Sequence, residues 1–126
     1  RAALIAEDLA PLVDFMSFGT NDLTQMTYGF SRDDVEASVI KKYIEMDILQ
    51  ESPFAQLDAL GVGKLVQEAI NSSRAINPEI KIGICGEHGG DPTSIRFLAN
   101  SGVDYVSCSP PRIPIARLVC AQESLK

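Results

Sequence analysis

The sequence predicts an α/β fold with a parallel sheet, because short apolar strands alternate with helical segments. Strand candidates lie at 13–18, 80–84 and 103–107, and each is followed by a turn and then by a helical pattern. Parallel strands joined by right-handed crossovers all point the same way. The carboxyl ends of the three strands are therefore expected at one edge of the sheet, which is called the rim below.

Helical periodicity is clearest over 62–76, where apolar residues form one broad face. That face consists of Val62, Leu65, Val66, Ala69, Ile70 and Ile76. Two shorter helices should follow the second and third strands. Their apolar positions are Ile95 and Leu98 for one helix, and Ile115, Leu118 and Val119 for the other.

An apolar pattern over 2–10 predicts a further helix before the first strand. Arg1 enters it with neither an initiator Met nor an N-cap residue, so the chain is expected to begin within a domain. The long connection 29–61 is interpreted as helical excursions over the rim. One of its helices should start at Ser38, and most of its charges should be solvated.

Three strands cannot close a barrel, and a parallel sheet is normally covered on both faces. The chain therefore either pairs with further sequence or is part of a (β/α)8 TIM barrel. In such barrels the active site lies at the carboxyl ends of the strands, which is the rim of the predicted sheet.

Composition narrows the class of protein. The 126 residues are 45% hydrophobic and 22% charged, which is ordinary for a globular domain and excludes disorder. No apolar run approaches the roughly 18 residues of a membrane span. The net charge of −6 argues against a nucleic-acid partner, because binding to phosphates needs clustered Lys and Arg. Three cysteines without framework spacing indicate a reducing compartment, so we predict a cytoplasmic location, with an organellar form as the alternative.

The run from Lys81 to Pro92 carries a lone thiol, Cys85, from an apolar strand into a bend that contains three glycines. Glycine lets the backbone take positive φ and approach a ligand closely. This is how a reactive side chain is presented at the end of a strand. The alternative is that Cys85 is simply packed, since free Cys is among the most buried residue types.

A second turn of the same form follows the first strand, where Gly19 leads into Thr20, Asn21 and Asp22. Any of these three polar side chains could cap the following helix, and the free N–H groups of that helix start suit an oxyanion or a carboxylate. Asp22 could also hold Mg²⁺, which typically takes one or two carboxylates together with water and substrate oxygens.

These two turns closely resemble those of the PEP-utilising enzymes, and among them the pyruvate, phosphate dikinase family. The resemblance is carried by Ser17–Asp34, Gly83–Pro92, Tyr105–Pro110 and Arg112–Arg117, and it spans essentially the whole chain. The run Gly-Thr-Asn-Asp-Leu-Thr-Gln alone is shared with phosphoenolpyruvate synthase and with enzyme I of the sugar phosphotransferase system. The runs Glu-His-Gly-Gly-Asp-Pro and Tyr-Gly-Phe-Ser-Arg-Asp-Asp favour the dikinases.

The resemblance implies that residues 1–126 are a C-terminal fragment of the PEP/pyruvate-binding TIM barrel, comprising its last three βα units and a preceding helix. The implied reaction reversibly converts ATP, phosphate and pyruvate into AMP, diphosphate and phosphoenolpyruvate. It runs through a phosphohistidine on a swivelling domain of the same parent chain, and the family's enzymes are homodimers through this barrel. ATP binds elsewhere in such a parent.

By the same resemblance, Gly19, Thr20, Asn21 and Asp22 form the substrate-binding turn, Asp22 is a Mg²⁺ ligand, and Cys85 is the acid that protonates the enolate carbon. The chemistry agrees, because a Mg²⁺ ion and fixed donors can stabilise an enolate oxygen. A thiol, with an ordinary pKa of about 8.5, can hold the proton at neutral pH. Partial burial in apolar surroundings is expected to keep it protonated.

The sequence also departs from the family pattern. A second Mg²⁺ carboxylate is expected just before Arg1, two substrate-binding arginines belong to earlier strands, and the phosphohistidine and ATP-grasp domains are absent. This chain alone is therefore expected to lack dikinase activity and to be poorly stable. The alternatives are an enzyme of the phosphoenolpyruvate synthase or enzyme I type, or a truncated module that keeps only a binding or dimer-forming surface.

The single histidine, His88, is expected to support Cys85 and not to carry the phosphoryl group, since the family's carrier lies in another domain. A zinc site of Cys85, His88 and Cys108 is disfavoured, because it lacks a fourth ligand and the usual paired spacing.

Four further residues have simpler expected roles. Cys108 ends the last strand and is expected to be packed in the interior, with a place in the site wall as the alternative. Cys120 should lie in the core. Glu87 is expected to hydrogen-bond within its turn. Asp91 should cap the helix that follows it.

Overall fold

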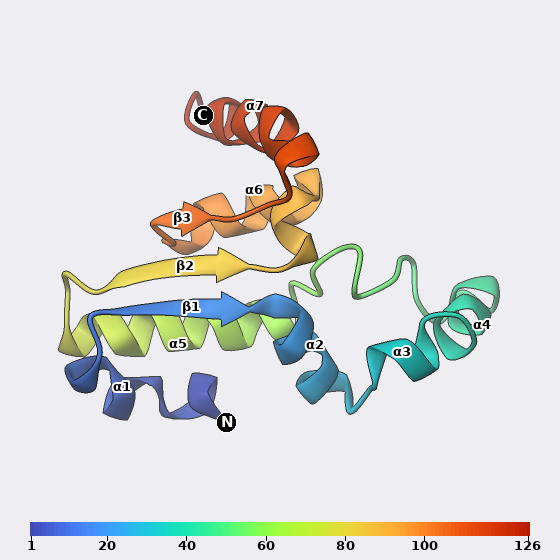
Figure 1. The fold of residues 1–126 in the computed structure, drawn as a ribbon, viewed down its shortest axis with the longest axis horizontal. Helices are drawn as coiled ribbons and strands as arrows, with labels where there is room; N and C mark the ends of the chain where they lie inside the picture. The colour runs from blue at the N-terminus through green and yellow to red at the C-terminus, as the bar shows by residue number, and fades with distance from the viewer.

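The computed structural model describes all residues 1–126 as a three-stranded parallel sheet with helices at its sides and ends (Figure 1). The strands are β1 (Phe15–Gly19), β2 (Lys81–Cys85) and β3 (Tyr105–Val106), in the spatial order β1-β2-β3. The predicted α/β class and the parallel pairing are confirmed. An open three-stranded sheet is consistent with part of a barrel, and the closed barrel stays a prediction.

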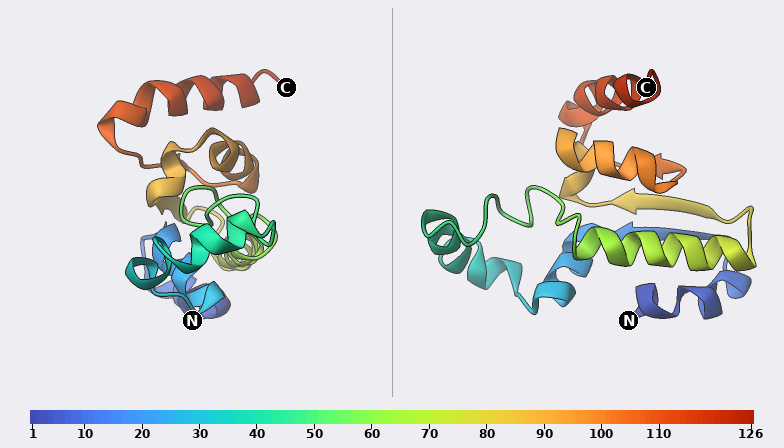
Figure 2. Two further views of the ribbon diagram at one scale, coloured as in Figure 1. Left: turned by 90° about the vertical axis from the view of Figure 1, so that its right-hand side faces the viewer. Right: turned by 180° about the vertical axis from the view of Figure 1, so that it is seen from behind.

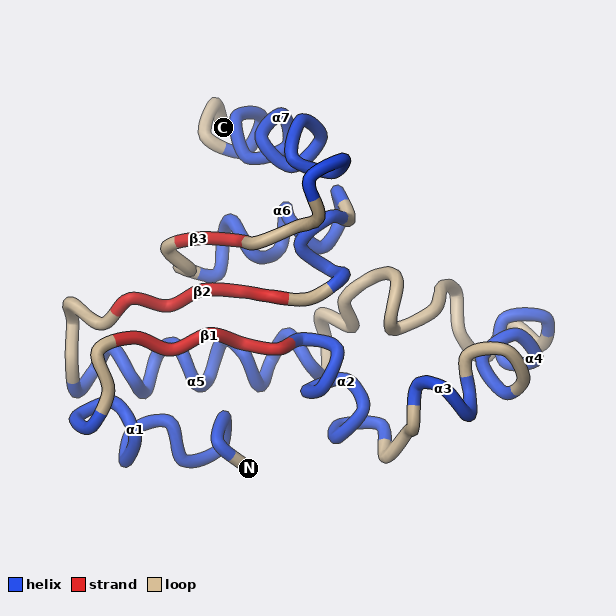
Figure 3. The backbone as a smooth tube through the Cα atoms, viewed as in Figure 1, coloured by secondary structure: helices blue, strands red, loops and turns tan.

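Seven α-helices and four short 3₁₀ turns complete the chain (Figure 3). The α-helices are α1 (Ala6–Leu9), α2 (Thr20–Tyr28), α3 (Arg32–Val35), α4 (Val39–Glu45), α5 (Val62–Ile76), α6 (Pro92–Ser101) and α7 (Ile113–Glu123). The 3₁₀ turns are η1 (Ala2–Ile5), η2 (Ala10–Leu12), η3 (Glu87–Gly90) and η4 (Pro110–Arg112). None of these helices has the length and apolar character of a membrane span.

The hydrophobic core lies between α5 and one face of the sheet. The view from behind in Figure 2 shows α5 running along the strands. Side chains alternate along a strand, so Ile82 and Ile84 of β2 point to α5, and their register partners Met16 and Phe18 pack on the same cluster. The predicted stripe of α5 supplies the other side of this core, although Leu65 is only half-buried and Ile76 is exposed at the helix end. Its fully buried members are Val62, Val66, Ala69 and Ile70.

The opposite face of the sheet carries no helix of this chain. Phe15 is 61% exposed and Tyr105 is 43% exposed on it. The Tyr105 ring lies across Gly83, its register partner, where a Cβ atom would collide with the ring. Glycine at this position therefore lets an aromatic side chain of β3 lie flat over β2.

Asp104 sets the pairing of the short strand β3 with β2. Its carboxylate accepts hydrogen bonds from the Ile82 N–H (2.7 Å) and from the Arg74 guanidinium (3.0 Å), and Lys81 Nζ lies 3.5 Å away. Its own N–H donates to the Ile82 carbonyl at 2.7 Å. The Ile82 N–H hydrogen bond lowers the pKa of Asp104, and the two cations lower it further.

The segment 2–10 is helical, as predicted, but it is not a single α-helix. The segment instead forms η1, α1 and η2 in succession, and only Ala6 and Ala10 are buried in it. Pro11 has no N–H to continue an α-helical ladder, which accounts for the change to 3₁₀ geometry at this end.

The excursion between α2 and α5 is helical, as predicted, and α4 has Ser38 as its N-cap residue. In Figure 1 α3 and α4 extend beyond the carboxyl ends of β1 and β2. The loop that follows returns to the rim and buries Pro53 and Phe54 there.

Helix α7 packs against α6 and stands away from the sheet (Figure 1). Only Val119 of its predicted apolar positions is buried, whereas Leu118 is 61% exposed. The prediction that Cys120 lies in the core is wrong, because this side chain is exposed. The reason is that α7 meets one helix and not a sheet, so only a narrow strip of it is covered.

Candidate functional site

The rim brings the two predicted turns together. Gly19 and Cys85 are register partners at the carboxyl ends of the adjacent parallel strands β1 and β2. Two residues back along β1, the Ser17 hydroxyl lies 3.6 Å from the Cys85 sulfur. Ser17 was not singled out from the sequence, although the two-residue alternation from Gly19 places it on the same face as Cys85.

Cys85 is exposed at the end of β2, so the expectation that its thiol is partly buried is wrong for this chain. The sulfur lies on the sheet face that no helix of the chain covers. The next residue, Gly86, has a φ of 137°. Only glycine readily takes this conformation, and it turns the chain sharply away from the strand into η3.

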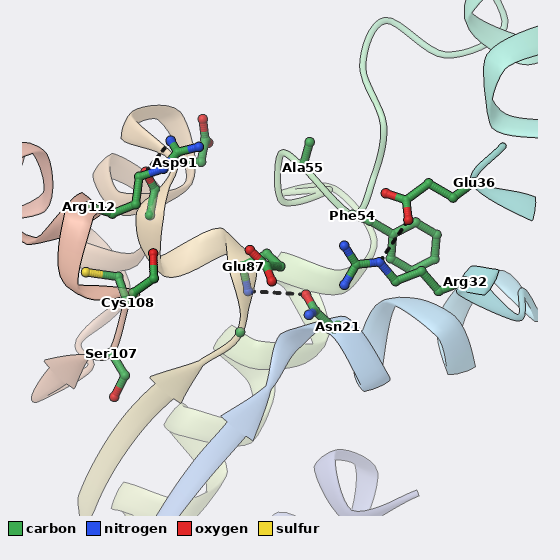
Figure 4. Close-up of a pocket in the computed structure, with 13 residues that line it drawn as sticks. Asn21, Arg32, Glu36, Phe54, Ala55, Glu87, Asp91, Ser107, Cys108 and Arg112 are labelled. Carbon is green, nitrogen blue, oxygen red and sulfur yellow. Dashed lines mark hydrogen bonds and ion pairs between the residues drawn. The ribbon is translucent and has the colours of Figure 1, made fainter.

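The Gly19–Asp22 turn opens α2 without a side-chain cap. Gly19 is the N-cap residue, and neither Thr20, Asn21 nor Asp22 caps the helix. Asn21 Oδ1 instead accepts the Glu87 N–H at 3.3 Å, a bond drawn in Figure 4. The Glu87 N–H therefore bonds to the neighbouring Gly19–Asp22 turn, whereas Glu87 was expected to hydrogen-bond within its own turn.

Thr20 is fully buried, and its hydroxyl lies 2.7 Å from His88 Nδ1. The other ring nitrogen of His88, Nε2, lies 2.8 Å from the carbonyl oxygen of Pro53. His88 is itself fully buried. His88 was expected to support Cys85, but its ring bonds to Thr20 and Pro53 and makes no hydrogen bond with Cys85.

Burial lowers the pKa of His88 below its ordinary value, and this effect exceeds the opposing ones of the Pro53 carbonyl and the Asp91 charge. The ring is therefore neutral at neutral pH. Asp91 caps α6 as predicted, since its carboxylate accepts from the Ser94 N–H at 2.7 Å and from the Ser94 hydroxyl at 2.6 Å.

A polar cavity of about 520 Å³ lies beside the rim, between η3 and the returning loop (Figure 4). Asn21 is the predicted site residue that lines it, and Gly19, Thr20, Asp22 and Cys85 do not. The remaining lining residues are Arg32, Glu36, Phe54, Ala55, Gly86, Glu87, Gly90, Asp91, Ser107, Cys108, Ser109 and Arg112.

One wall of this cavity is held by Arg32. Its Nε donates to Glu36 at 3.1 Å, and its guanidinium lies 5.6 Å from the centre of the buried Phe54 ring. The opposite wall includes Arg112, whose guanidinium donates to the Gly90 carbonyl at 3.3 Å. Sequence reasoning missed both arginines as site residues, because each reaches the rim only through tertiary packing.

A sequence profile described as "PEP-utilising enzyme, PEP-binding domain" matches residues 1–125. The chain belongs to the PEP-utilising enzymes. The resemblance predicted from the two turns and the C-terminal runs is thereby confirmed.

Several curated proteins similar to this PEP-utilising domain are dikinases. The chain is 58% identical over 122 residues to "Pyruvate, phosphate dikinase, chloroplastic" of Flaveria pringlei and to "Pyruvate, phosphate dikinase 1, chloroplastic" of Arabidopsis thaliana. It is 55% identical over 125 residues to "Pyruvate, phosphate dikinase 2" of Oryza sativa subsp. japonica. These alignments cover 97%, 97% and 99% of the chain, but only 13%, 13% and 14% of the respective relatives.

Metal-binding side chains are not clustered in this PEP-utilising domain. The structure contains no group of three or more His, Cys, Asp or Glu side chains that could hold a metal ion. Both nitrogens of His88 have hydrogen-bond partners, Thr20 and Pro53. Cys108 is half-buried and lines the cavity, in contrast to the expectation that it is mainly packed.

Proposed function

We propose that this chain forms part of the pyruvate- and PEP-handling site of a dikinase that interconverts ATP, phosphate and pyruvate with AMP, diphosphate and phosphoenolpyruvate. The longer protein that contains the chain is called the parent protein below. The observation that carries the proposal is the pairing of Gly19 with Cys85 at the rim, because it brings a thiol beside a helix start. The similarity to dikinases over 97% of the chain supports the same reaction.

In this proposal Cys85 is the acid and base of the pyruvate half-reaction. When phosphoenolpyruvate gives up its phosphoryl group, the enolate of pyruvate remains, and the Cys85 thiol donates its proton to the methylene carbon. In the opposite direction the thiolate removes that proton. The exposed position of the sulfur lets it reach a ligand, and the Ser17 hydroxyl 3.6 Å away keeps it directed along the open face.

The helix start after Gly19 supplies donors to the substrate. The first N–H groups of a helix have no partner within it, and they lie at the positive end of the helix dipole. Thr20 is fully buried and its hydroxyl is bonded to His88, so its part in this proposal is to hold the turn, and the residues that face a ligand are Asn21 and Asp22. Asn21 has one amide oxygen engaged by Glu87, and its amide nitrogen remains available to a ligand.

Asp22 fits the role of a Mg²⁺ ligand. Its carboxylate is exposed at the rim, one helix residue from Asn21, and no side chain of the structure forms an ion pair with it. Magnesium needs only one or two protein carboxylates when substrate oxygens and waters complete its coordination. Bound there, the ion would stabilise negative charge on the enolate oxygen.

The proposal extends to the partners and the location. A phosphohistidine domain of the parent protein would bring the phosphoryl group to the rim, and the parent would be a homodimer in the cytoplasm or in an organelle. The small share of the relatives' length that this chain spans supports a larger parent, and several of those relatives are named as chloroplastic.

The test separates the two half-reactions in the parent protein. Cys85→Ala should abolish the formation of phosphoenolpyruvate from pyruvate, while phosphorylation of the enzyme by ATP and phosphate continues. The matched control is Cys120→Ala, which removes an exposed thiol from α7 and should leave both half-reactions intact. Normal turnover of pyruvate by Cys85→Ala would refute the assignment.

A further inference from the structure

The ring of His88 connects three segments that are distant in the sequence. It belongs to η3, it reaches Thr20 at the start of α2 through Nδ1, and it reaches Pro53 in the returning loop through Nε2. Both partners and the ring are buried. No other side chain of the rim joins all three of these segments by hydrogen bonds.

The direction of both hydrogen bonds follows from the chemistry of the partners. The Pro53 carbonyl can only accept, so Nε2 carries the proton of the neutral ring. Nδ1 of the same tautomer then accepts, and the Thr20 hydroxyl donates to it. The Thr20 hydroxyl also lies 3.5 Å from the Cys85 carbonyl oxygen, but the contact with Nδ1 is much shorter, at 2.7 Å. A buried polar group without a partner is costly, so this ring helps to hold both Thr20 and Pro53 in place.

Each partner fixes a different wall of the candidate site. Thr20 lies beside Gly86, where a Cβ atom would lie 2.5 Å from the Thr20 hydroxyl, so the two turns are in close contact. Pro53 precedes Phe54, whose buried ring holds Arg32 at the cavity. A movement of the His88 ring would therefore change both the helix start and the wall of the cavity.

We propose that His88 is a positioning residue that holds the Gly19–Asp22 turn and the Pro53–Ala55 wall at a fixed separation. It does so through Thr20 and Pro53 and does not touch the substrate. The role of His88 in holding these two segments does not depend on which reaction the protein catalyses. The effect of His88 on pyruvate turnover rests on the proposed function.

Two substitutions separate the two bonds. His88→Asn keeps an amide oxygen near the position of Nδ1 and loses the reach to Pro53. His88→Gln places an amide N–H₂ near the position of Nε2 and loses the acceptor for Thr20. Each variant removes one hydrogen bond, which should speed local exchange by about five-fold.

The experiment is hydrogen exchange, read by mass spectrometry on peptides of the intact parent protein. His88→Asn should raise exchange over 50–57 and leave 20–28 near wild type, and His88→Gln should do the reverse. Thr20→Val should reproduce the His88→Gln pattern, and combining these two substitutions should add no further exchange. Thr20→Ser, which keeps the hydroxyl, is the matched control and should retain the wild-type pattern.

Kinetics supply the second measurement. Both His88 variants should lower kcat/KM for pyruvate several-fold and leave phosphorylation by ATP and phosphate unchanged. Unchanged exchange in both segments would overturn the inference, and so would a uniform rise across the whole chain in both variants, because that is the response of an ordinary core residue. A parent protein without dikinase activity would refute the proposed function, while the exchange patterns would still decide the role of His88.

Discussion

The Ser17 hydroxyl lies 3.6 Å from the Cys85 sulfur, across two adjacent strands. The contact comes from the parallel register, in which Ser17 pairs with Gly83 and Gly19 with Cys85, so that Ser17 and Cys85 are diagonal neighbours on one face. Gly83, which lies between them on that face, has no side chain, and the Tyr105 ring occupies the space above it.

Ser17→Ala should therefore impair pyruvate turnover more mildly than the loss of the thiol. A single hydrogen bond contributes about 1 kcal/mol, so the rate of the pyruvate half-reaction should fall by about five-fold in the parent protein. Ser17→Thr, which keeps a hydroxyl, should recover part of the rate. An undiminished rate in Ser17→Ala would mean that Cys85 needs no orienting partner.

Asp22→Asn should weaken the Mg²⁺-dependent binding of oxalate, a mimic of the enolate. The exposed carboxylate would be replaced by a neutral amide of the same shape, so the fold should survive while affinity falls by at least about ten-fold. Calorimetry on the parent protein measures this directly. Asp14→Asn, which changes an exposed acid before β1 at the far end of that strand from the rim, should leave the affinity unaltered.

Asp104→Asn should loosen β3 from β2. The amide keeps the size of the side chain but weakens the bond with the Ile82 N–H and removes the attraction to Arg74 and Lys81. Hydrogen exchange over 82–84 and 105–107 should rise several-fold in the parent protein. Similar exchange in variant and wild type would show that backbone bonds alone secure β3.

The same carboxylate predicts a dependence on pH. Hydrogen bonding and cations lower the pKa of folded Asp104, so the folded state binds its proton less readily than the unfolded state. Its stabilising effect is complete above the unfolded pKa and is lost as the pH falls through the folded pKa. The difference in local exchange rate between wild type and Asp104→Asn should therefore disappear at low pH. A difference that persists below both pKa values would contradict this assignment.

The chain expressed alone should self-associate and should show no dikinase activity. Its open sheet face exposes Phe15 and Tyr105, and α7 exposes Leu118, so the apolar surface invites contact with other copies. Thermal unfolding should be measured together with oligomer size by light scattering. A sharp cooperative transition from a monomer would favour an independent module instead.

The sequence alone predicted the features that depend on local pattern. The alternation of strands and helices sufficed to place Gly19 and Cys85 at one edge, and the Ser94 contacts of Asp91 follow from a capping pattern within four residues. The roles of Thr20 and His88 could not be predicted in the same way, because their bond joins residues 68 positions apart.

The same limit explains the differences between prediction and structure at the two ends of the chain. The apolar spacing of α7 is helical, but spacing does not reveal whether a helix meets a sheet or a single neighbour, so Cys120 was expected in the core. At the other end, the apolar pattern over 2–10 is compatible with α-helical and with 3₁₀ geometry, and Pro11 accounts for the 3₁₀ turn η2.

The excursion between α2 and α5 also bears on how the domain folds. Strands β1 and β2 can pair only after a long loop closes, since the Asn21–Glu87 bond at their ends spans 66 residues. Contacts so distant in the sequence form slowly, because the chain loses loop entropy before pairing compensates for it. That entropy grows only with the logarithm of loop length, by about 0.6 kcal/mol per doubling. Insertions at the exposed residues 45–48 should therefore leave the equilibrium stability of the rim almost unaltered, while shifting the rate at which its two strands meet.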